Sequence, residues 1–274
     1  MKRVHVLEFE DLRWFPAWLR DCMTKNIAVM AGWLGVRHPL ARLISRALQV
    51  QKLSTIVDLG SGSGGVLPET LPEVQGTAGL EETCLILSDK YPNHSAIQEY
   101  AGAHAQVRYL NESLDATQLH TAPDGLKTMV NCFHHLRPEQ ARDVLTSAVE
   151  SKQPLLVYEM AGHQTVPFAA WLLTLPLGLT IVFFMACVKS AFARPFTWRQ
   201  FVFTYLIPLI PLFYAWDGQA SMPRIYGFED LKELLQDLEN DDYTWEMGYG
   251  ESAAGKKLGS YLLGMPRTAT SAID

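Results

Sequence analysis

Five short apolar segments, separated from one another by helical or polar segments, dominate the middle of the chain. They read TIVDLG, CLILSD, QVRYL, KTMVNCF and PLLVYEM, and they cover residues 55–60, 84–89, 106–110, 127–133 and 154–160. Buried parallel strands carry continuous apolar runs of this kind. Between the last two runs, residues 138–151 have the apolar spacing of an amphipathic helix. The alternation predicts an α/β fold with a doubly wound parallel sheet.

The segments on either side of these strands predict the rest of the architecture. Apolar residues recur at three- and four-residue spacing over residues 9–50, which indicates helices. A further helix is expected over residues 227–240, and YTWEMGYGE and GSYLLGMP predict a terminal antiparallel hairpin. We therefore expect a seven-stranded, Rossmann-like sheet with four parts: an N-terminal helical lid (1–53), the sheet core (54–161), an apolar helical-hairpin insertion (162–221), and a C-terminal helix and hairpin that complete the core (222–274).

A glycine-rich loop, IVDLGSGSGG at residues 56–65, follows the first predicted strand. Gly60, Gly62 and Gly65 satisfy GxGxxG, a dinucleotide pattern that is weak by itself. Asp58 lies two residues before Gly60, and Gly60, Gly62 and Gly64 also form GxGxG. A pyrophosphate favours backbone N–H groups and a helix N-terminus, whereas a carboxylate at Asp58 suits a cationic ligand. This acidic-x-GxGxG motif resembles that of class I methyltransferases, which use S-adenosylmethionine (SAM).

The resemblance covers residues 54–161 firmly and the C-terminal hairpin loosely, and it implies the cofactor and its contacts. Asp58, Gly60, Ser61, Gly62 and Gly64 would form the loop for the methionine end; Asp89, with Lys90 beside it, would bind the ribose; Leu114 and Asp115 would contact the adenine; Asn131 and Phe133 would face the cofactor after the fourth strand. The interval from Gly60 to Asp89 is longer than the usual interval of about 20 residues. The flanking segments EDLRWFPAWLRDCMT and FTYLIPLIPLFYAWDG resemble a bacterial group of these enzymes with an apolar insertion after strand five, which implies architecture but no acceptor.

Candidate catalytic groups follow the fourth and fifth strands. His134 or His135 is the proposed general base, because the pKa of histidine suits proton transfer near neutral pH. Adjacent histidines are expected to point in different directions, with one facing the site. Glu159 either binds a substrate hydroxyl or amine or pairs with a neighbouring base. Asp217 either returns to the pocket mouth or is a turn residue before Gly218, and the turn is favoured.

The N-terminal helices and the cysteines complete the list of candidates. Trp14, Phe15 and Arg20 either close a lid over the cofactor or belong to a helix on the sheet edge. The four cysteines are scattered, and no Cys or His spacing is typical of a metal site. We therefore expect no metal and no disulfide framework.

Two uncharged stretches raise a separate question. Residues 166–188 are long enough to cross a membrane, whereas residues 201–216 are shorter than the roughly 20 residues that a span needs. Lys189, Arg194 and Arg199 lie between them without an acid, so two spans would place a basic loop outside, against the positive-inside rule. Three alternatives remain: monotopic membrane contact through residues 166–216, a soluble cap or homodimer seal, and true spanning. Aromatic residues that suit an interfacial belt are Trp171, Trp198, Tyr214 and Trp216.

The function that these patterns favour is SAM-dependent methyl transfer to oxygen or nitrogen of a hydrophobic small molecule or lipid-like acceptor. The alternative is a non-catalytic, membrane-attached SAM-binding or interaction module; a dehydrogenase is disfavoured by Asp58 and the GxGxG spacing. The net charge of −6 argues against a nucleic-acid partner. We expect a bacterial protein in the cytoplasm, at the inner face of the membrane.

Overall fold

The structure, a computed structural model, describes residues 1–102, 106–162, 167–238 and 240–267. The start of the first apolar stretch, residue 166, and residue 239 of the helix expected over 227–240 lie outside the described residues.

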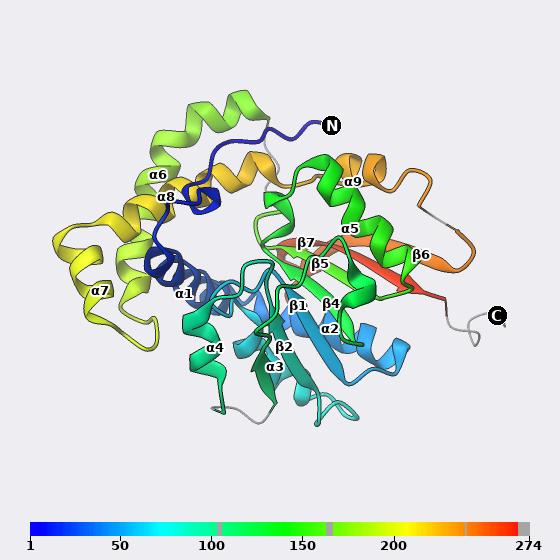
Figure 1. The fold of residues 1–274 in the computed structure, drawn as a ribbon. Helices are drawn as coiled ribbons and strands as arrows, with labels where there is room; N and C mark the ends of the chain where they lie inside the picture. Colours follow the sequence, from blue (N-terminus) through cyan, green and yellow to red (C-terminus); the bar gives the residue numbers. More distant parts are fainter. Residues whose placement is uncertain (103–105, 163–166, 239, 268–274) are drawn as a thin grey trace.

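One sheet of seven strands forms the centre of the molecule (Figure 1). The strands are β1 (Thr55–Leu59), β2 (Cys84–Ser88), β3 (Val107–Tyr109), β4 (Leu126–Val130), β5 (Leu155–Glu159), β6 (Tyr243–Glu251) and β7 (Lys257–Pro266). Their order is β3-β2-β1-β4-β5-β7-β6; β1 to β5 are parallel, and β7 pairs antiparallel with both β5 and β6. The predicted seven-stranded α/β sheet and its terminal hairpin are confirmed.

Helices cover both faces of this sheet and extend beyond one edge (Figure 1). The helices in the described residues are α1 (Ala17–Leu34), α2 (Arg37–Gln51), α3 (Leu67–Gln75), α4 (His94–Tyr100), α5 (Pro138–Glu150), α6 (Phe168–Ser190), α7 (Trp198–Phe201), α8 (Leu209–Arg224) and α9 (Phe228–Leu234). Short turns are η1 (Phe9–Asp11), η2 (Leu119–Thr121), η3 (Phe133–His135) and η4 (Val202–Leu206, a π-helical turn).

Alternate residues of the parallel strands enter two different cores. Ile56 of β1 and Leu156 of β5 pack with α2 and α3, whereas Val57 and Val157 pack with α5 and α9 on the other face. Successive side chains of a strand point to opposite faces of a sheet. Because both faces are covered, the strands must be apolar throughout, which is why they were recognisable in the sequence.

A third core joins the N-terminal helix to the insertion. Phe15 and Met23 of the N-terminal region pack against Ile210 and Tyr214 of α8, and Ala186 of α6 is part of the same cluster. The three helices α1, α6 and α8 lie together beside the sheet (Figure 1). They enclose space at the carboxyl edge of the strands, where open α/β sheets bind ligands.

Proline residues explain where the helices depart from the sequence predictions. The first helix begins at Ala17 rather than near residue 9, because Pro16 occupies its N-cap and residues 9–11 form only one turn. The second apolar stretch is not one helix: Ile207, before Pro208, has the non-helical angles φ −130° and ψ 87°, and the two flanking segments meet at 79°. A residue before proline is biased away from helical backbone. The expected helix over 227–240 ends at Leu234.

The insertion keeps most of its apolar side chains on the surface. Helix α6 is long and apolar enough to cross a membrane, and only 11% of its most apolar 18-residue window is buried. The two segments on either side of Pro208, residues 198–206 and 209–224, are long and apolar enough to cross a membrane only if they are counted together as one bent span. Helix α6 is therefore not a core helix of the fold.

Candidate functional site

The glycine-rich loop is held in place by Asp58 at the end of β1. One carboxylate oxygen of Asp58 accepts a hydrogen bond from Ser61 Oγ at 2.6 Å, and the other accepts from Thr128 Oγ1 of β4 at 2.8 Å. Burial raises the pKa of Asp58 to about 7, and the two hydroxyl donors oppose that shift. Asp58 is therefore a buried side chain that holds the loop against the sheet, and it is not exposed on the loop surface.

Glycine is required at the loop by close neighbours as well as by backbone conformation. Gly64 has φ of 119°, and a Cβ there would lie 2.6 Å from Tyr100 Oη. Gly60 has φ of 76°, and a Cβ there would lie 3.2 Å from Cys132 Sγ. Residues with a side chain rarely adopt these conformations. The loop consequently exposes backbone rather than side chains to anything bound against it.

Asp89 lies against the glycine-rich loop in spite of its long sequence interval. It follows β2, and its Oδ2 accepts a hydrogen bond from the backbone N–H of Gly62 at 3.0 Å, while Oδ1 accepts from Tyr91 N–H at 2.8 Å. Burial raises the pKa of Asp89. The carboxylate thus stands next to the loop at the carboxyl end of β2, as the predicted ribose contact requires.

The segment after β3 joins the same edge. The backbone N–H of Leu114 donates to the Asp89 carbonyl at 3.1 Å, and Leu114 itself is buried. Asp115 forms an ion pair with Lys90 at 2.7 Å and accepts two hydrogen bonds from Thr117. Asp89, Lys90, Leu114 and Asp115 therefore gather beside the glycine-rich loop. Their roles in binding the ribose and adenine remain predictions.

The two predicted cofactor residues after β4 have different surroundings. Asn131 has φ of 55°, accepts a hydrogen bond from the Met160 N–H at 2.8 Å, and lines a cavity. Phe133 is only 1% exposed, and its ring packs against Tyr226 at 5.3 Å between centroids. The side chain of Phe133 belongs to the core on the α5 and α9 face, so the predicted cofactor contact is wrong for that side chain. An aromatic ring with a buried apolar position available is more stable there than at an open rim.

His134 and Glu159 form a buried pair at the ends of β4 and β5. Glu159 Oε2 lies 2.8 Å from His134 Nδ1, and Oε1 accepts the backbone N–H of His134 at 3.0 Å. An ionised carboxylate can only accept, so Nδ1 is the donor of this hydrogen bond, and in a neutral His134 the lone pair is then on Nε2. Nε2 is buried and has no hydrogen-bond partner among the described residues. Of the two roles considered for Glu159, pairing with a base is the one that the geometry displays.

His135 lies beside His134 rather than pointing elsewhere. The ring centroids are 4.3 Å apart, so the expectation that the adjacent histidines diverge is wrong. Both residues belong to the tight turn η3, which the N-terminal segment covers. His135 Nδ1 contacts Asp11 Oδ1 at 2.8 Å and Glu8 Oε2 at 3.2 Å. Burial lowers the pKa of His135, but the carboxylates of Asp11 and Glu8 prevail and raise it overall.

Glu8 and Arg224 complete this arrangement from opposite ends of the chain. Both side chains are fully buried, and Arg224 Nη1 lies 3.1 Å from Glu8 Oε2 and 2.7 Å from Asp11 Oδ2. Burial raises the pKa of Glu8 to about 8, and the positive charges of His135 and Arg224 only partly oppose this. We call Glu8, Glu10, Asp11, His134, His135 and Glu159 the histidine–carboxylate cluster.

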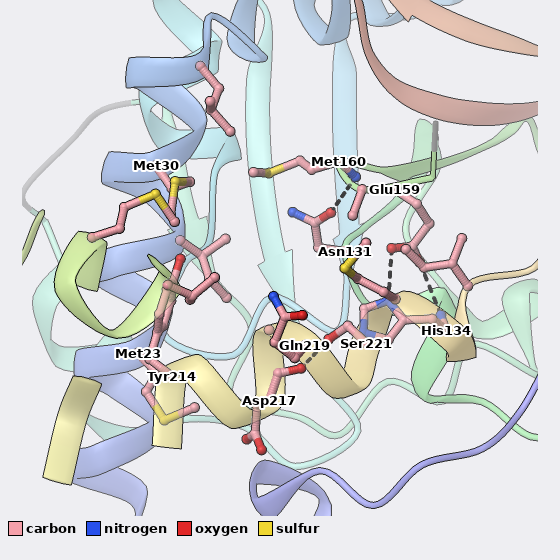
Figure 2. A pocket seen from close by; sticks show the side chains of 18 of the residues that line it. Met23, Met30, Asn131, His134, Glu159, Met160, Tyr214, Asp217, Gln219 and Ser221 are labelled. Atoms are coloured by element: carbon pink, nitrogen blue, oxygen red, sulfur yellow. Dashed lines mark hydrogen bonds and ion pairs between the residues drawn. The ribbon is translucent and has the colours of Figure 1, made fainter. Parts of the chain in front are cut away.

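A cavity of about 300 Å³ opens beside this cluster. Figure 2 shows His134, Glu159 and Asn131 on one side of it and Met23 and Met30 on another. Its walls come from α1, α6, α8 and the ends of β4 and β5. The methionines that line it are Met23, Met30, Met160, Met185 and Met222. The cavity is therefore mostly apolar, with a polar end at His134 and Glu159.

Asp217 borders the cavity but does not form a turn. It lies inside α8, and its carboxylate accepts the backbone N–H groups of Phe9 and Glu10 at 2.8 and 3.1 Å. The turn that we favoured before Gly218 is wrong, because the helix continues to Arg224. Asp217 instead holds the N-terminal turn η1 over the site.

The predicted lid residues also have distinct roles. Phe15 is buried in the core shared with the insertion, and Trp14 is 67% exposed. Arg20 donates to the carbonyl oxygens of Glu10 and Leu12 at 2.9 and 2.6 Å, which fixes the N-terminal turn. These contacts bind the N-terminal segment to the helices around the cavity rather than to the glycine-rich loop.

The predicted aromatic belt is wrong in part. Trp171 and Tyr214 are buried; Trp171 Nε1 donates to the Gln219 carbonyl at 2.9 Å and so joins α6 to α8. Trp198 is 67% exposed. Lys189 is buried with its ammonium over the Trp33 ring, so Arg194 and Arg199 are the exposed bases of the connector. The large apolar side chains exposed on the insertion are mainly aliphatic residues of α6 and residues around α7 and η4.

The sequence reading missed Glu8, Glu10, Asp11 and Arg224. The three acids lie in the N-terminal segment, more than 100 residues before His134, and Arg224 lies at the end of α8, 90 residues after it. No local motif marks them; the available signal was a group of acids before an apolar helix and an arginine at the end of an apolar stretch. Only the fold brings them to the histidines.

Comparison with known proteins gives matches among solved structures only. No protein-family model and no curated protein sequence matches the chain. The plantazolicin methyltransferase BpumL in complex with SAH aligns over 92% of this chain and 98% of its own, at 10% identity and a TM-score of 0.52. BpumL in complex with a monoazolic desmethylPZN analog and SAH aligns over 91% of this chain and 98% of its own, at 13% identity and a TM-score of 0.50. The chain therefore has the fold of class I SAM-dependent methyltransferases.

Proposed function

We propose that the protein transfers a methyl group from SAM to oxygen or nitrogen of a hydrophobic small molecule or lipid-like acceptor. One observation carries the proposal: a glycine-rich loop with acids at the ends of β1 to β3 and an apolar cavity with the His134–Glu159 pair at its polar end lie at the carboxyl edge of the same sheet, although no loop residue lines the cavity itself. The neighbour BpumL binds SAH, the product form of SAM, in a structure of the same fold.

The residues along the carboxyl edge of the sheet suit this cofactor. The close contacts at Gly60 and Gly64 leave a loop of bare backbone, and the Asp89 carboxylate stands beside it. Asp58, Asp89 and Asp115 supply negative charge for a cationic ligand with hydroxyl and amino groups. When bound, SAM supplies an electrophilic methyl group on its sulfonium.

The cavity suits a lipophilic acceptor. About 300 Å³ is the size of a small ligand site, and apolar walls with a few polar groups are typical of such sites. Five methionines give the walls flexible, polarizable surfaces that adapt to irregular apolar shapes. Polar groups line it at His134, Glu159 and Asn131, and also along α8 at Asp217, Gln219 and Ser221. The acceptor's heteroatom would lie at the His134–Glu159 pair, and its apolar part would extend between α1, α6 and α8.

His134 is the group that would remove the acceptor's proton. Glu159 holds the ring through Nδ1 and leaves the lone pair of Nε2 available. After proton transfer, the same carboxylate would stabilise the imidazolium. Positioned acid–base groups of this type contribute about 10²- to 10⁴-fold to a rate. His135, held by Asp11, would position the turn rather than touch the acceptor.

The exposed apolar surface of the insertion supports membrane contact, and the basic connector favours attachment over two spans. Leu173 is 83% exposed, Leu177 is 64% exposed and Phe184 is 63% exposed, all on α6. Arg194 and Arg199 are exposed near Trp198 and would meet anionic headgroups. Because α6 and α8 also form cavity walls, an acceptor dissolved in the bilayer would reach the cavity through this surface.

Transfer of isotope-labelled methyl groups tests the proposal. The protein, purified in mild detergent, is incubated with methyl-labelled SAM and an organic extract of bacterial lipids, and the label is followed into the organic phase. We expect label in a discrete lipophilic compound. Binding of SAM without label in any fraction would favour the non-catalytic SAM-binding module instead.

A further inference from the structure

We propose that Glu8, His134 and His135 form a binding site for one divalent transition-metal ion, with Zn²⁺ as the probe. One potential ligand atom from each residue lies within 4.8 Å of the other two. Two imidazoles and one carboxylate are a ligand set used by Zn²⁺ and by Fe²⁺. The site lies at the wall of the cavity, because His134 is itself a lining residue.

The contact of His134 with Glu159 orients the His134 ring as a ligand. His134 Nδ1 is paired with Glu159, and His135 Nδ1 is paired with Asp11, each at 2.8 Å. Metal-binding histidines commonly donate their second ring N–H to a carboxylate in this way, which fixes the tautomer and leaves the other nitrogen for the ion. His135 is placed differently: its Nδ1 contacts both Asp11 and Glu8, at 2.8 and 3.2 Å, and its Nε2 lies 3.5 Å from Glu10 Oε1.

Glu8 supplies an independent indication. Its side chain is fully buried, and neither of its oxygens accepts a hydrogen bond from the described residues. Oε2 has ion-pair contacts with Arg224 and His135, whereas Oε1 faces His134 Nε2 at 3.9 Å. Both Oε1 and that Nε2 are buried without partners. Two buried polar atoms that face each other at 3.9 Å without a hydrogen bond leave a position for a cation, since an unsatisfied buried polar group is costly.

The charge of the surroundings is consistent with a divalent cation. Four carboxylates contact the histidines: Glu8, Glu10, Asp11 and Glu159. Two guanidinium groups approach from the described residues: Arg224 contacts Glu8 and Asp11, and Arg3 donates to the His134 carbonyl. The four acidic side chains outnumber the two guanidinium groups, which favours a cation in these surroundings.

An ion at this position would present an open coordination site to the cavity. Three protein ligands leave a fourth tetrahedral position. A role in binding the acceptor's oxygen or nitrogen rests on the proposed function. Metal binding itself is measured without methyl transfer, so the two proposals fail separately.

Calorimetric titration of the metal-free full chain with ZnCl₂ tests the site. The wild-type protein should bind one equivalent, and Glu8→Gln, which preserves the side-chain volume, should weaken binding by at least about 100-fold. His135→Asn should do the same. His120→Asn, at an exposed histidine, is the matched control and should bind as the wild type does. Thermal unfolding of each variant checks that it is folded.

Binding to the wild type alone decides the case if the Glu8 variant does not fold. A Co²⁺-loaded wild-type protein should show the visible absorption of a four- or five-coordinate ion with nitrogen ligands, and Zn²⁺ should displace it. Absence of Zn²⁺ uptake by the wild type, or uptake that is lost in His120→Asn and kept in Glu8→Gln, would overturn the site. SAM affinity, measured alongside, reports separately on the cofactor loop.

Discussion

The two halves of the site are built in opposite ways. The cofactor half consists of loops that directly follow β1, β2 and β3, and its contacts join residues close to a recognisable motif, such as Asp58 with Ser61. The acceptor half draws on the N-terminal segment, η3, the end of β5 and α8, and its contacts join residues as distant as Glu8 and Arg224. A shared fold can thus fix the cofactor while the added segments define the acceptor.

This difference implies that the two halves can be disabled separately. Changes at the strand-end loops should act on SAM affinity, whereas changes in the histidine–carboxylate cluster should act on turnover. Changes on the outer surface of α6 should affect neither directly, but only the concentration of acceptor that the enzyme meets. The predictions below test these separations.

Replacement of His134 should have the largest effect. His134→Gln removes the lone pair of Nε2 at the cavity wall but keeps a polar side chain next to Glu159. We expect kcat to fall by about 10²- to 10⁴-fold, with SAM affinity within a factor of two of the wild type. Single-turnover kinetics and calorimetry measure the two quantities. Unchanged kcat would remove His134 both as the base and as a ligand to the reacting centre.

Replacement of Asp58 should mainly affect the cofactor. Asp58→Ala removes the acceptor of two buried hydroxyl hydrogen bonds and frees the glycine-rich loop. We expect SAM affinity to fall by about 100-fold or more, since hydrogen bonds to a charged group contribute about 1.5–3 kcal/mol each. Asp124→Ala, at an exposed aspartate, is the control. Near-normal affinity in calorimetry would contradict the assignment of this loop to SAM.

Charges on the outer face of α6 should weaken membrane attachment. The double change Leu173→Lys and Leu177→Lys places two charges at positions whose side chains are already exposed, so the fold should tolerate it. We expect binding to phosphatidylglycerol vesicles to fall by about 10- to 100-fold, because a buried lysine costs far more than a leucine at a membrane. Val50→Lys on α2 is the control, and equal sedimentation of all three proteins would favour the cap or dimer alternatives.

The pH dependence of SAM affinity should be the smallest of these effects. The pKa of Asp58 is raised to about 7, so its ionised fraction grows roughly tenfold between pH 6 and pH 8. A cationic ligand favours the ionised form, so affinity should rise by up to about tenfold over that range, and Asp58→Asn should flatten the profile. If the SAM affinity of the wild type does not change with pH, the ionisation of Asp58 does not contribute to SAM binding.

The raised pKa of Asp58 also affects stability. A rise in pH should strengthen SAM binding but lower the free energy of unfolding. The folded chain retains the Asp58 proton up to about pH 7, whereas an unfolded aspartate loses it near pH 3.8. The folded state therefore binds more protons between these values, and this group lowers the free energy of unfolding as pH rises through that window. Denaturant titrations of wild type and Asp58→Asn at pH 5 and pH 8 should show the difference.

The sequence predicted those features whose physical cause is local. Strands buried on both faces must be apolar throughout, and the Gly60–Gly64 loop requires glycine for steric reasons, so both were visible without a structure. Asp89 was identified by its place after a strand, although its distance from Gly60 was unusual. The break at Pro208 and the start of α1 after Pro16 shifted boundaries, but not the nature of the elements.

The sequence could not predict contacts between segments that only tertiary packing brings together. Arg224 and Glu8 are 216 positions apart in the numbering, and each is fully buried against the other. Likewise, Trp171 and Tyr214 resembled membrane-facing aromatics, but they join the insertion helices to the rest of the fold. Composition shows that an apolar stretch must be covered, but it does not show by what.

Mass spectrometry of the protein purified in mild detergent, first under native conditions and then after organic extraction, tests the central claim most directly. The account predicts bound SAM or SAH together with a co-purifying lipophilic molecule of a size that fits a cavity of about 300 Å³. A protein that arrives empty and also fails to take up added SAM would contradict it, because the glycine-rich loop would then be a structural turn and the acceptor half would have no methyl donor.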